Sequence, residues 1–306
     1  MAHVVDKDGR TNVDWRGAFV EAGDLQVHYV RAGHVRADQG RPVVLLHGWP
    51  EFARTWLHNL PELAQHFDVI APEFRGFGET TSNRERDPGG TPPLRLAQDL
   101  AAFLDALGLD TVDLVSHDVG SFVAQAFALA YPKRVRRLFF FNCAYPGIGA
   151  RWGQADNFPE LWYQQFHQKD FAAALVGSSR EATRIYFNHF LTHWCRRKDA
   201  FAPYLDEWVE NFSRPGNIQG GFDWYVGVSA FRRRMMREGA VAVPKITVPT
   251  YVLWGRHDPV LQYAWTDKLG DTFETVTLEC AEEAGHFVHF EVPRLANERM
   301  IAFLKA

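Results

Sequence analysis

The sequence predicts a mostly parallel α/β sheet flanked by helices, with a helical insertion between two of its strands. Short apolar runs typical of buried strands alternate with helical patterns through much of the 306-residue chain. A strand pattern, a tight turn and a helix pattern follow one another around Asp118. The alternation then stops between residues 146 and 241. We therefore expect a core domain made of residues 1–145 and 242–306, and a helical cap domain at 146–241.

The expected elements of the core follow in chain order. Residues 25–30 alternate apolar and polar side chains, which is typical of a half-buried edge strand, whereas 42–46 form the continuous apolar run of a buried strand. The polar stretch 82–93 is rich in Gly and Pro, which predicts a surface loop. Further strands are expected at 68–71, 112–115, 135–141, 251–254 and 275–278, and helices at 55–66, 94–108, 122–130 and 292–304.

Composition and charge exclude several classes of protein. The net charge of −4 and the pI near 6.4 provide no basic field for nucleic acid or anionic lipid. The apolar runs are shorter than the ~20 residues that span a bilayer, and the first ten residues show no apolar signal-peptide region.

Cys143, Cys195 and Cys280 are widely spaced, which indicates free thiols in a reducing compartment. We therefore expect a cytoplasmic protein.

The segment at 146–241 predicts several helices and is rich in aromatic side chains. Residues 151–240 hold 18 aromatics in 90 positions, or 20%, against 14% for the whole chain. An aromatic-rich helical insertion between two sheet strands predicts a lid over an apolar pocket. A second small core is the alternative, and the two are compatible.

The turn around Asp118 is the strongest indication of chemistry. Small residues, Ser116 and Gly120, stand two positions before and two positions after it. A nucleophile elbow normally reads G-x-S-x-G, so here an aspartate stands in the place of the serine. A carboxylate in that place attacks an electrophilic carbon and becomes an ester itself. The alternative is that Asp118 caps the following helix, which aspartate does well.

Two further residues follow strands in the order expected for such an elbow. Asp258 comes after the strand at 251–254, where ligands bind in open α/β sheets. His286 follows the last expected strand. The order Asp118, Asp258, His286 is that of nucleophile, acid and histidine in this class of fold. Taken singly, Asp258 is also consistent with a turn residue and His286 with a surface histidine.

Backbone N–H groups near the elbow are expected to stabilise an oxyanion. In this geometry the donors are the N–H of Trp49, after the strand at 42–46, and that of Val119, directly after the nucleophile. The side chain of Trp49 is expected to line the pocket.

Together these motifs, at 47–50, 75–78, 117–120, 255–258 and 285–288, resemble the α/β-hydrolase superfamily and, more narrowly, its epoxide hydrolases. The resemblance covers nearly the whole chain. It implies an α/β-hydrolase fold with a helical cap, in which an epoxide becomes a vicinal diol through a hydroxyalkyl ester on Asp118. It implies neither a metal nor an organic cofactor.

The resemblance also implies two cap phenols that hydrogen-bond the epoxide oxygen. Residues 161–166 resemble the first cap motif and assign Tyr163, and residues 216–225 resemble the second and assign Tyr225. Trp224, beside the second phenol, is expected to line the substrate pocket with Trp49. Two other cap phenols, Tyr186 and Tyr204, lie in less similar contexts.

Dehalogenases that use the same aspartate are the first alternative. Haloalkane dehalogenases resemble this chain but carry Trp where it has Val119. Fluoroacetate-type enzymes carry Arg in place of Val119 and Phe122, and His-Trp in place of Tyr163 and Gln164. Some related enzymes place the triad acid after the strand ending near 141, where this chain has Asn142.

A non-catalytic binding protein with the same fold is the second alternative. The expected partner is a small apolar epoxide, with no nucleic acid and no membrane. A homodimer is compatible with the sequence, which does not determine the oligomeric state.

Overall fold

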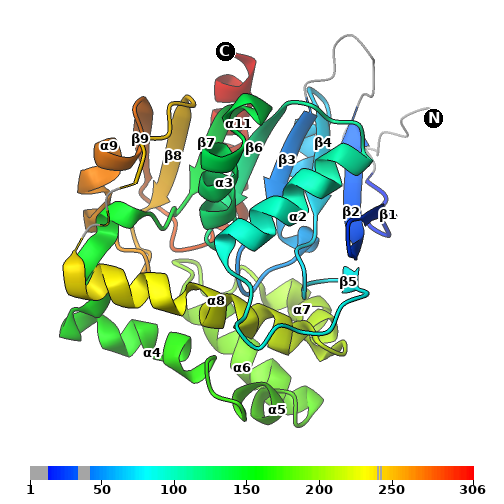
Figure 1. Cartoon of the computed structure of the whole chain (residues 1–306), viewed down its shortest axis with the longest axis vertical. Helices are drawn as coiled ribbons and strands as arrows, with labels where there is room; N and C mark the ends of the chain where they lie inside the picture. Colours follow the sequence, from blue (N-terminus) through cyan, green and yellow to red (C-terminus); the bar gives the residue numbers. More distant parts are fainter. Residues whose placement is uncertain (1–12, 34–41, 240, 242) are drawn as a thin grey trace.

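A twisted sheet forms the centre of the computed structural model, which describes residues 13–33, 42–239, 241 and 243–306 (Figure 1). Its strands are β1 (Ala18–Ala22), β2 (Leu25–Gly33), β3 (Pro42–Leu46), β4 (Asp68–Pro72), β5 (Thr81–Ser82), β6 (Val112–His117), β7 (Val135–Phe141), β8 (Thr250–Gly255) and β9 (Val276–Ala281). The order in the sheet is β1-β2-β4-β3-β6-β7-β8-β9, with β5 beside β2. The pairs from β4 to β9 are parallel, and β2 is antiparallel to its neighbours. The predicted mostly parallel sheet is therefore confirmed.

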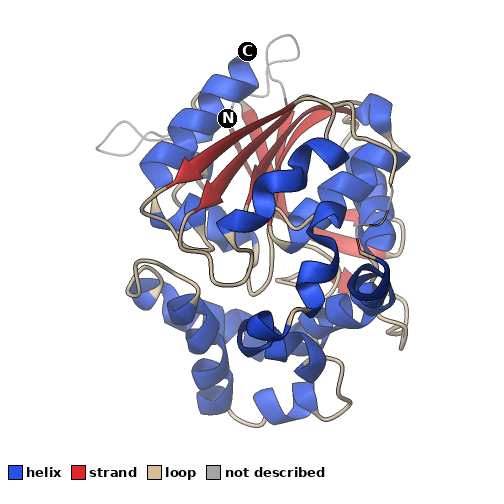
Figure 2. Cartoon of the chain, turned by 90° about the vertical axis from the view of Figure 1, so that its left-hand side faces the viewer, coloured by secondary structure: helices blue, strands red, loops and turns tan. Residues whose placement is uncertain are grey.

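Helices cover both faces of this sheet because its central strands are apolar on both sides. Val43 and Leu45 of β3 pack with α1 and α11, whereas Val44 and Leu46 pack with α2 and α3. Figure 2 shows the strands between these helix layers. The helices of the core are α1 (Leu60–Leu63), α2 (Pro93–Ala106), α3 (Val119–Ala130), α9 (Leu269–Thr272), α10 (Val288–Glu291) and α11 (Pro293–Lys305).

A helical insertion follows β7 and precedes β8, as the sequence predicts. Its helices are α4 (Phe158–Phe166), α5 (Ala172–Val176), α6 (Arg180–His193), α7 (Leu205–Ser213) and α8 (Asn217–Glu238). They lie beyond the edge at which the parallel strands end (Figures 1 and 2). This region is called the cap below, and its division from the core at residues 146 and 241 stays a prediction.

Two expectations about individual elements were wrong. Residues 25–30 do not form an edge strand, because β1 pairs outside β2. The helix expected at 55–66 is instead a short 3₁₀ turn, Ala53–Trp56, followed by the four-residue α1. Pro61 explains this break, since proline is tolerated in the first turn of a helix but removes a hydrogen bond from its interior.

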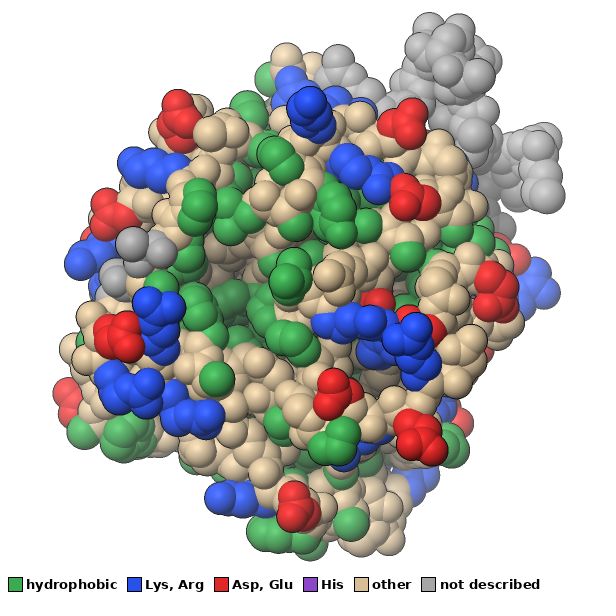
Figure 3. All heavy atoms as spheres, viewed as in Figure 1, with side chains coloured by type: hydrophobic (Ala, Val, Ile, Leu, Met, Phe, Trp, Pro, Cys, Tyr) green, Lys and Arg blue, Asp and Glu red, His purple; other side chains and the backbone are tan. Residues whose placement is uncertain are grey.

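The face seen in Figure 3 carries acidic and basic side chains interspersed, without an extended field of either sign. Among the residues that the structure describes, no helix combines the length and the apolar character needed to cross a membrane.

The turn between β6 and α3 forces unusual backbone geometry on Asp118. Its φ of 46° and ψ of −113° lie outside the regions that L-residues favour. Two residues later, α3 passes so close to β3 that a Cβ on Gly120 would lie 2.4 Å from the carbonyl oxygen of Leu46. The small residue in the motif is therefore required by packing between a helix and the neighbouring strand.

Substitution of Gly120 by alanine should destabilise the fold. The added methyl group meets backbone atoms, so we expect a loss of ~1–3 kcal/mol, as for other overpacked positions. Thermal unfolding followed by circular dichroism measures this. Gly270→Ala is the matched control, because nothing lies within 4 Å of a Cβ added at that helical position. Equal unfolding temperatures for the two variants would contradict the packing argument.

Candidate active site

The carboxylate of Asp118 lies at the carboxyl edge of the sheet, where β6 meets α3. Its side chain is 17% exposed, and its Oδ1 accepts the backbone N–H of Trp49 at 3.0 Å. Although Asp118 stands at the N-cap position of α3, its side chain makes no capping hydrogen bond there. Asp118 therefore does not cap α3 through its side chain, which was the alternative explanation for an aspartate at this position.

His286 lies between two carboxylates that come from different strands. Its Nδ1 is 2.8 Å from Oδ2 of Asp258, and its Nε2 is 3.8 Å from Oδ2 of Asp118. The ring is fully buried. Tertiary structure thus brings together the three residues that the sequence proposed as a triad, from the ends of β6, β8 and β9.

Asp258 is held in place by hydrogen bonds to both of its oxygens. Oδ1 accepts the backbone N–H groups of Val260 and Leu261 at 2.8 and 3.0 Å. Oδ2, which faces His286, also accepts the side-chain amide of Asn142. Asn142 itself has a positive φ of 43°, and its Oδ1 accepts the N–H of Gly255 at 2.9 Å. In some related enzymes the triad acid directly follows the strand that corresponds to β7. Here Asn142 stands at that position and donates a hydrogen bond to Asp258, which follows the neighbouring strand β8.

Electrostatics favour the protonated form of His286. Burial disfavours the charged ring, but the neighbouring Asp258, followed by Asp118 and Glu51, raises the pKa of His286 to about 9. At neutral pH the imidazolium is therefore stabilised between the two carboxylates. Removing the charge of Asp118, as ester formation would, must lower this pKa.

Tyr163 and Tyr225 reach the site from α4 and α8 of the cap. Both are 2% exposed, and their ring centroids are 5.5 Å apart. Burial raises the pKa of both phenols, and the negative charge of Asp118 raises it further. Both hydroxyls therefore stay protonated at neutral pH and are available as donors near the carboxylate.

Tryptophan side chains form much of the aromatic surroundings. Trp49 stacks on Tyr163 with centroids 5.4 Å apart and an interplanar angle of 6°, and it meets Tyr225 edge-on at 5.6 Å. Trp224 lies 5.5 Å from the ring of Phe122 on α3. The two tryptophans proposed to line the pocket thus join the cap to the core beside Asp118.

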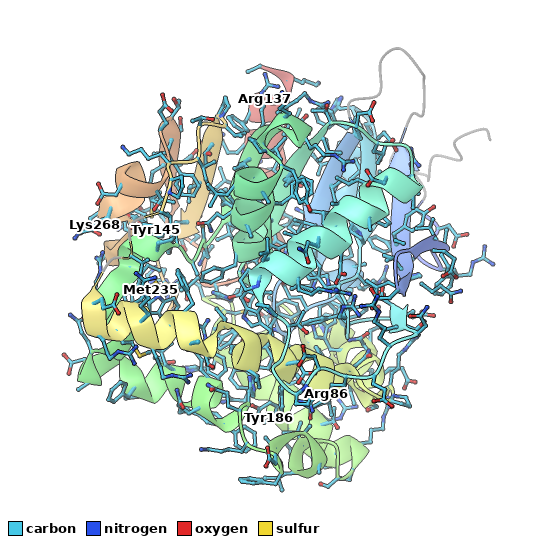
Figure 4. All side chains as sticks on the ribbon, in the orientation of Figure 1. Arg86, Arg137, Tyr145, Tyr186, Met235 and Lys268 are labelled. Atoms are coloured by element: carbon cyan, nitrogen blue, oxygen red, sulfur yellow. The ribbon has the colours of Figure 1, made fainter. Side chains whose placement is uncertain are left out.

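The other cap phenols have different surroundings. The hydroxyl of Tyr186, labelled in Figure 4, lies 2.6 Å from Nε2 of His167. The ring of Tyr204 packs against His58 and Phe290 of the core. The charge of Asp118 raises the pKa of Tyr163 and Tyr225, whereas burial and Tyr163 raise that of Tyr186, so the pair chosen from the sequence remains the better candidate.

Sequence reasoning missed a buried polar cluster beneath the triad. Glu51 accepts the N–H of Gly48 and lies 2.8 Å from His117 Nδ1 and 3.1 Å from His289 Nε2. The Nε2 of His117 in turn lies 2.9 Å from the carbonyl oxygen of His286. Glu51 therefore connects the loop that carries Trp49 to the backbone of His286. His117 lies in the motif at 117–120 and His289 directly follows the motif at 285–288, which was the available signal.

This cluster also has the composition of a metal site. Ligand atoms of Glu51, His117 and His289 lie within 4.8 Å of one another. Burial raises the pKa of Glu51, but the two histidines outweigh it and hold that pKa well below its usual value, while burial lowers the pKa of His289 to about 4. The ionised carboxylate of Glu51 is hydrogen-bonded to the rings of His117 and His289. These hydrogen bonds explain the arrangement without a metal ion.

The fold and this site place the chain in a known class. A family model described as "alpha/beta hydrolase fold" matches residues 41–293. The chain is 31% identical over 289 residues to "Soluble epoxide hydrolase" of Corynebacterium sp. (strain C12), covering 91% of this chain and 93% of that protein. The chain therefore belongs to the α/β-hydrolase family and, within it, to the epoxide hydrolase-like members. The resemblance inferred from the motifs is confirmed at this level.

Other relatives agree with this assignment. The chain is 26% identical over 293 residues to "Epoxide hydrolase 4" of Mus musculus, covering 94% of this chain and 78% of that protein. The solved structure "Epoxide hydrolase CorEH without ligand" superposes with a TM-score of 0.80 at 28% identity, covering 96% of this chain and 99% of that one.

The protonation of His286 can be tested without a substrate. In the wild type the ring should lose its proton as the pH rises through about 9. Asp258→Asn removes the larger electrostatic cause, so the pKa of His286 should fall by about 1–3. Asp118→Asn should lower it less. Imidazole resonances followed by NMR through a pH titration measure these values.

Glu283→Gln is the control for this titration, because it exchanges an exposed acid three positions from His286 for its amide. It should leave the titration unchanged. A wild-type ring that titrates near 6.5 and is insensitive to Asp258→Asn would show that the two carboxylates do not control its charge.

Proposed function

We propose that this protein is an epoxide hydrolase that converts an epoxide and water into a vicinal diol. The observation that carries the proposal is the combination around Asp118. A carboxylate on an elbow, an imidazole paired with a second carboxylate, and two protonated phenols lie within one buried site. These are the groups that opening an epoxide and hydrolysing the resulting ester require.

The first step is alkylation of the nucleophile. An oxygen of Asp118 attacks a carbon of the oxirane, an ester bond to that carbon forms, and the carbon–oxygen bond of the ring breaks. The departing oxygen would be an alkoxide, which is a poor leaving group. Hydrogen bonds from Tyr163 and Tyr225 stabilise its charge, and one phenol supplies the proton.

The second step is hydrolysis of the ester. Because Asp118 has lost its charge, the pKa of His286 falls, and the imidazolium gives up its proton, which restores the phenol that became a phenolate in the first step. The neutral ring then accepts a proton from water. The resulting hydroxide attacks the carbonyl carbon of the ester. The N–H groups of Trp49 and Val119 stabilise the oxyanion; Val119 begins α3, so its N–H has no partner within the helix. The ester bond breaks, the departing oxygen takes the hydroxyl proton of the tetrahedral intermediate, and the diol leaves with Asp118 ionised again. Asp258 stabilises the imidazolium that results.

The aromatic surroundings support a small, mainly apolar epoxide as substrate. Trp49 and Trp224 present ring surface beside the nucleophile, and no step needs a metal or an organic cofactor.

A cytoplasmic location is part of the proposal, since all three cysteines are free thiols. The proposal includes no partner of nucleic acid or membrane, and it leaves monomer and homodimer open.

A dehalogenase is the second candidate, and one observation favours it. The indole N–H groups of Trp49 and Trp224 are buried and have no acceptor within the described part of the chain. Such donors are suited to holding a halide. Against this candidate, Val119 and Phe122 provide no bidentate clamp for a halocarboxylate. Fluoride released from fluoroacetate at a rate comparable to diol formation would reassign the activity.

The covalent intermediate should accumulate when the base is removed. His286→Gln leaves alkylation possible but cannot activate water, so incubation with styrene oxide should add the mass of one whole epoxide to the protein. Intact-protein mass spectrometry detects the adduct, and peptide mapping should locate it at Asp118. The double variant with Asp118→Asn is the control and should stay unlabelled. A wild type that hydrolyses styrene oxide while the single variant never acquires an adduct would refute the mechanism.

The phenol pair should act on the rate of alkylation more than on binding. Loss of one donor typically costs ~2.7–4 kcal/mol in a comparable oxyanion site. Because two donors share one oxygen, Tyr163→Phe and Tyr225→Phe should each retain some activity, and the double variant almost none. Pre-steady-state alkylation is the measurement. Tyr186→Phe, which alters a third cap phenol, should alkylate within a few-fold of wild type. If the double variant alkylates at the wild-type rate, these tyrosines are packing residues.

A further inference from the structure

Arg232, on α8 of the cap, is a buried cation that has no counter-ion among the described residues. The residue is 8% exposed, and its Nε is buried without a hydrogen-bond partner among the residues that the structure describes. Guanidinium carries five donors, and buried ones are normally paired with carboxylates or carbonyls. Cation–π contacts with the rings of Trp152 and Tyr225 offset part of the cost of burying this charge. They leave its N–H donors without an acceptor, however, so its position calls for a functional explanation.

The guanidinium lies beside the proposed phenol pair. Its carbon is 5.0 Å from the ring centroid of Trp152 and 5.5 Å from that of Tyr225. Arg232 precedes Met235 by three positions in α8, and Met235 is labelled in Figure 4. The cation therefore stands next to the group that would receive the epoxide oxygen, although the mechanism above does not use it.

Trp152 supplies a second donor without a partner. Its side chain is 1% exposed, and its indole N–H is buried with no acceptor among the residues described. Two neighbouring unpaired donors, one of them a cation, match a ligand that brings acceptor atoms and negative charge. A guanidinium binds a carboxylate through two parallel hydrogen bonds, and an indole N–H adds a third.

The nearby acidic groups of the protein do not neutralise Arg232. Burial lowers its pKa, and the opposing interactions come from Tyr163, Tyr225 and Asp118. The phenols are neutral at physiological pH, and Asp118 is bound to the N–H of Trp49 and is the proposed nucleophile. A guanidinium nevertheless stays protonated in proteins. Its charge is thus available to a ligand.

We propose that Arg232 and Trp152 bind a carboxylate of the substrate, so that the substrate class is an epoxide carrying a carboxylate on an otherwise apolar body. This inference rests on the proposed function. Electrostatic support of the phenols by Arg232 is the competing explanation. That role needs only the charge, however, and leaves the unpaired N–H of Trp152 unexplained.

The test compares two epoxides that differ only in charge. 4-(Oxiran-2-yl)benzoate and 4-(oxiran-2-yl)benzamide are offered to the wild type, and terminal epoxyalkanoates of increasing length are compared with their amides. We expect the wild type to prefer the carboxylate through a lower KM. In Arg232→Met, the ratio of kcat/KM for carboxylate over amide should fall ~10–100-fold, as for loss of hydrogen bonds to a charged group. Arg232→Lys should restore part of the ratio.

Two further variants separate binding from folding. Trp152→Phe keeps an aromatic ring but removes the N–H, and it should lower the same ratio ~3–10-fold. Arg233→Met removes an exposed cation from the next position of α8 and should leave the ratio unchanged. Should Arg232→Met fail to fold, Arg232→Lys and Trp152→Phe still give the ratio. A ratio that stays constant in these variants overturns the proposal, because the guanidinium then acts on both substrates alike.

A binding measurement distinguishes this proposal from the proposed function. Calorimetry with 4-ethylbenzoate, which has no epoxide, should show binding to the wild type that Arg232→Met weakens by a similar factor. Turnover of epoxides with no preference for carboxylates would overturn the carboxylate site and keep the hydrolase. Binding of 4-ethylbenzoate through Arg232 without turnover of any epoxide would keep the carboxylate site and overturn the hydrolase.

Discussion

Asp118 has φ 46° and ψ −113°, a conformation that costs an L-residue on the order of 1–3 kcal/mol, and the surrounding site is arranged to hold it there. The sheet and α3 fix the backbone on either side of it. Gly120 lets α3 approach β3 closely enough to complete the turn. The N–H of Trp49 then fixes the direction of the carboxylate from the neighbouring strand. The strain is maintained because packing on both sides leaves the residue no relaxed alternative.

Charge is the second constraint, because several ionisable groups share a space with little water. His286 stands between Asp118 and Asp258, while Glu51 lies beneath them with His117 and His289. A buried carboxylate is tolerated only when it is paired and hydrogen-bonded, and Glu51 meets both conditions. This cluster ties the loop of Trp49 to the backbone of His286. The positions of oxyanion donor and proposed base are thereby coupled through one buried carboxylate.

The cap contributes what the core lacks. The sheet edge supplies Asp118, His286 and Asp258, which are the proposed nucleophile, base and acid. The phenols that suit the proposed reaction come from α4 and α8, and the unpaired guanidinium of Arg232 comes from α8 as well. An electrophile bound between core and cap would thus have the nucleophile on one side and hydrogen-bond donors on the other. Under the proposed function, choice of substrate is accordingly a property of the cap.

The sequence by itself determined those features that are written in contiguous residues. Apolar runs predicted most of the strands, because a strand buried on both faces needs apolar side chains on both faces. The elbow around Asp118 was recognisable because the small residues that its tight turn requires fall within five consecutive positions. Asp258, His286, Tyr163 and Tyr225 were found through local motifs and their order. Pro61 was a local signal that our expectation of a helix at 55–66 overlooked.

Only the tertiary structure decided which distant residues meet. Glu51 and His289 lie in different parts of the chain, as do Asn142 and Asp258, or Trp152 and Arg232, and no periodicity links the members of these pairs. Arg232 is notable because it is buried and has no carboxylate partner in the described part of the chain, and both are properties of its surroundings and not of its residue type. A lone arginine in an amphipathic helix is normally a solvated side chain. Arg232 is a candidate binding residue because α8 packs against the segment that holds Trp152, eighty positions earlier. A sequence pattern does not encode that contact.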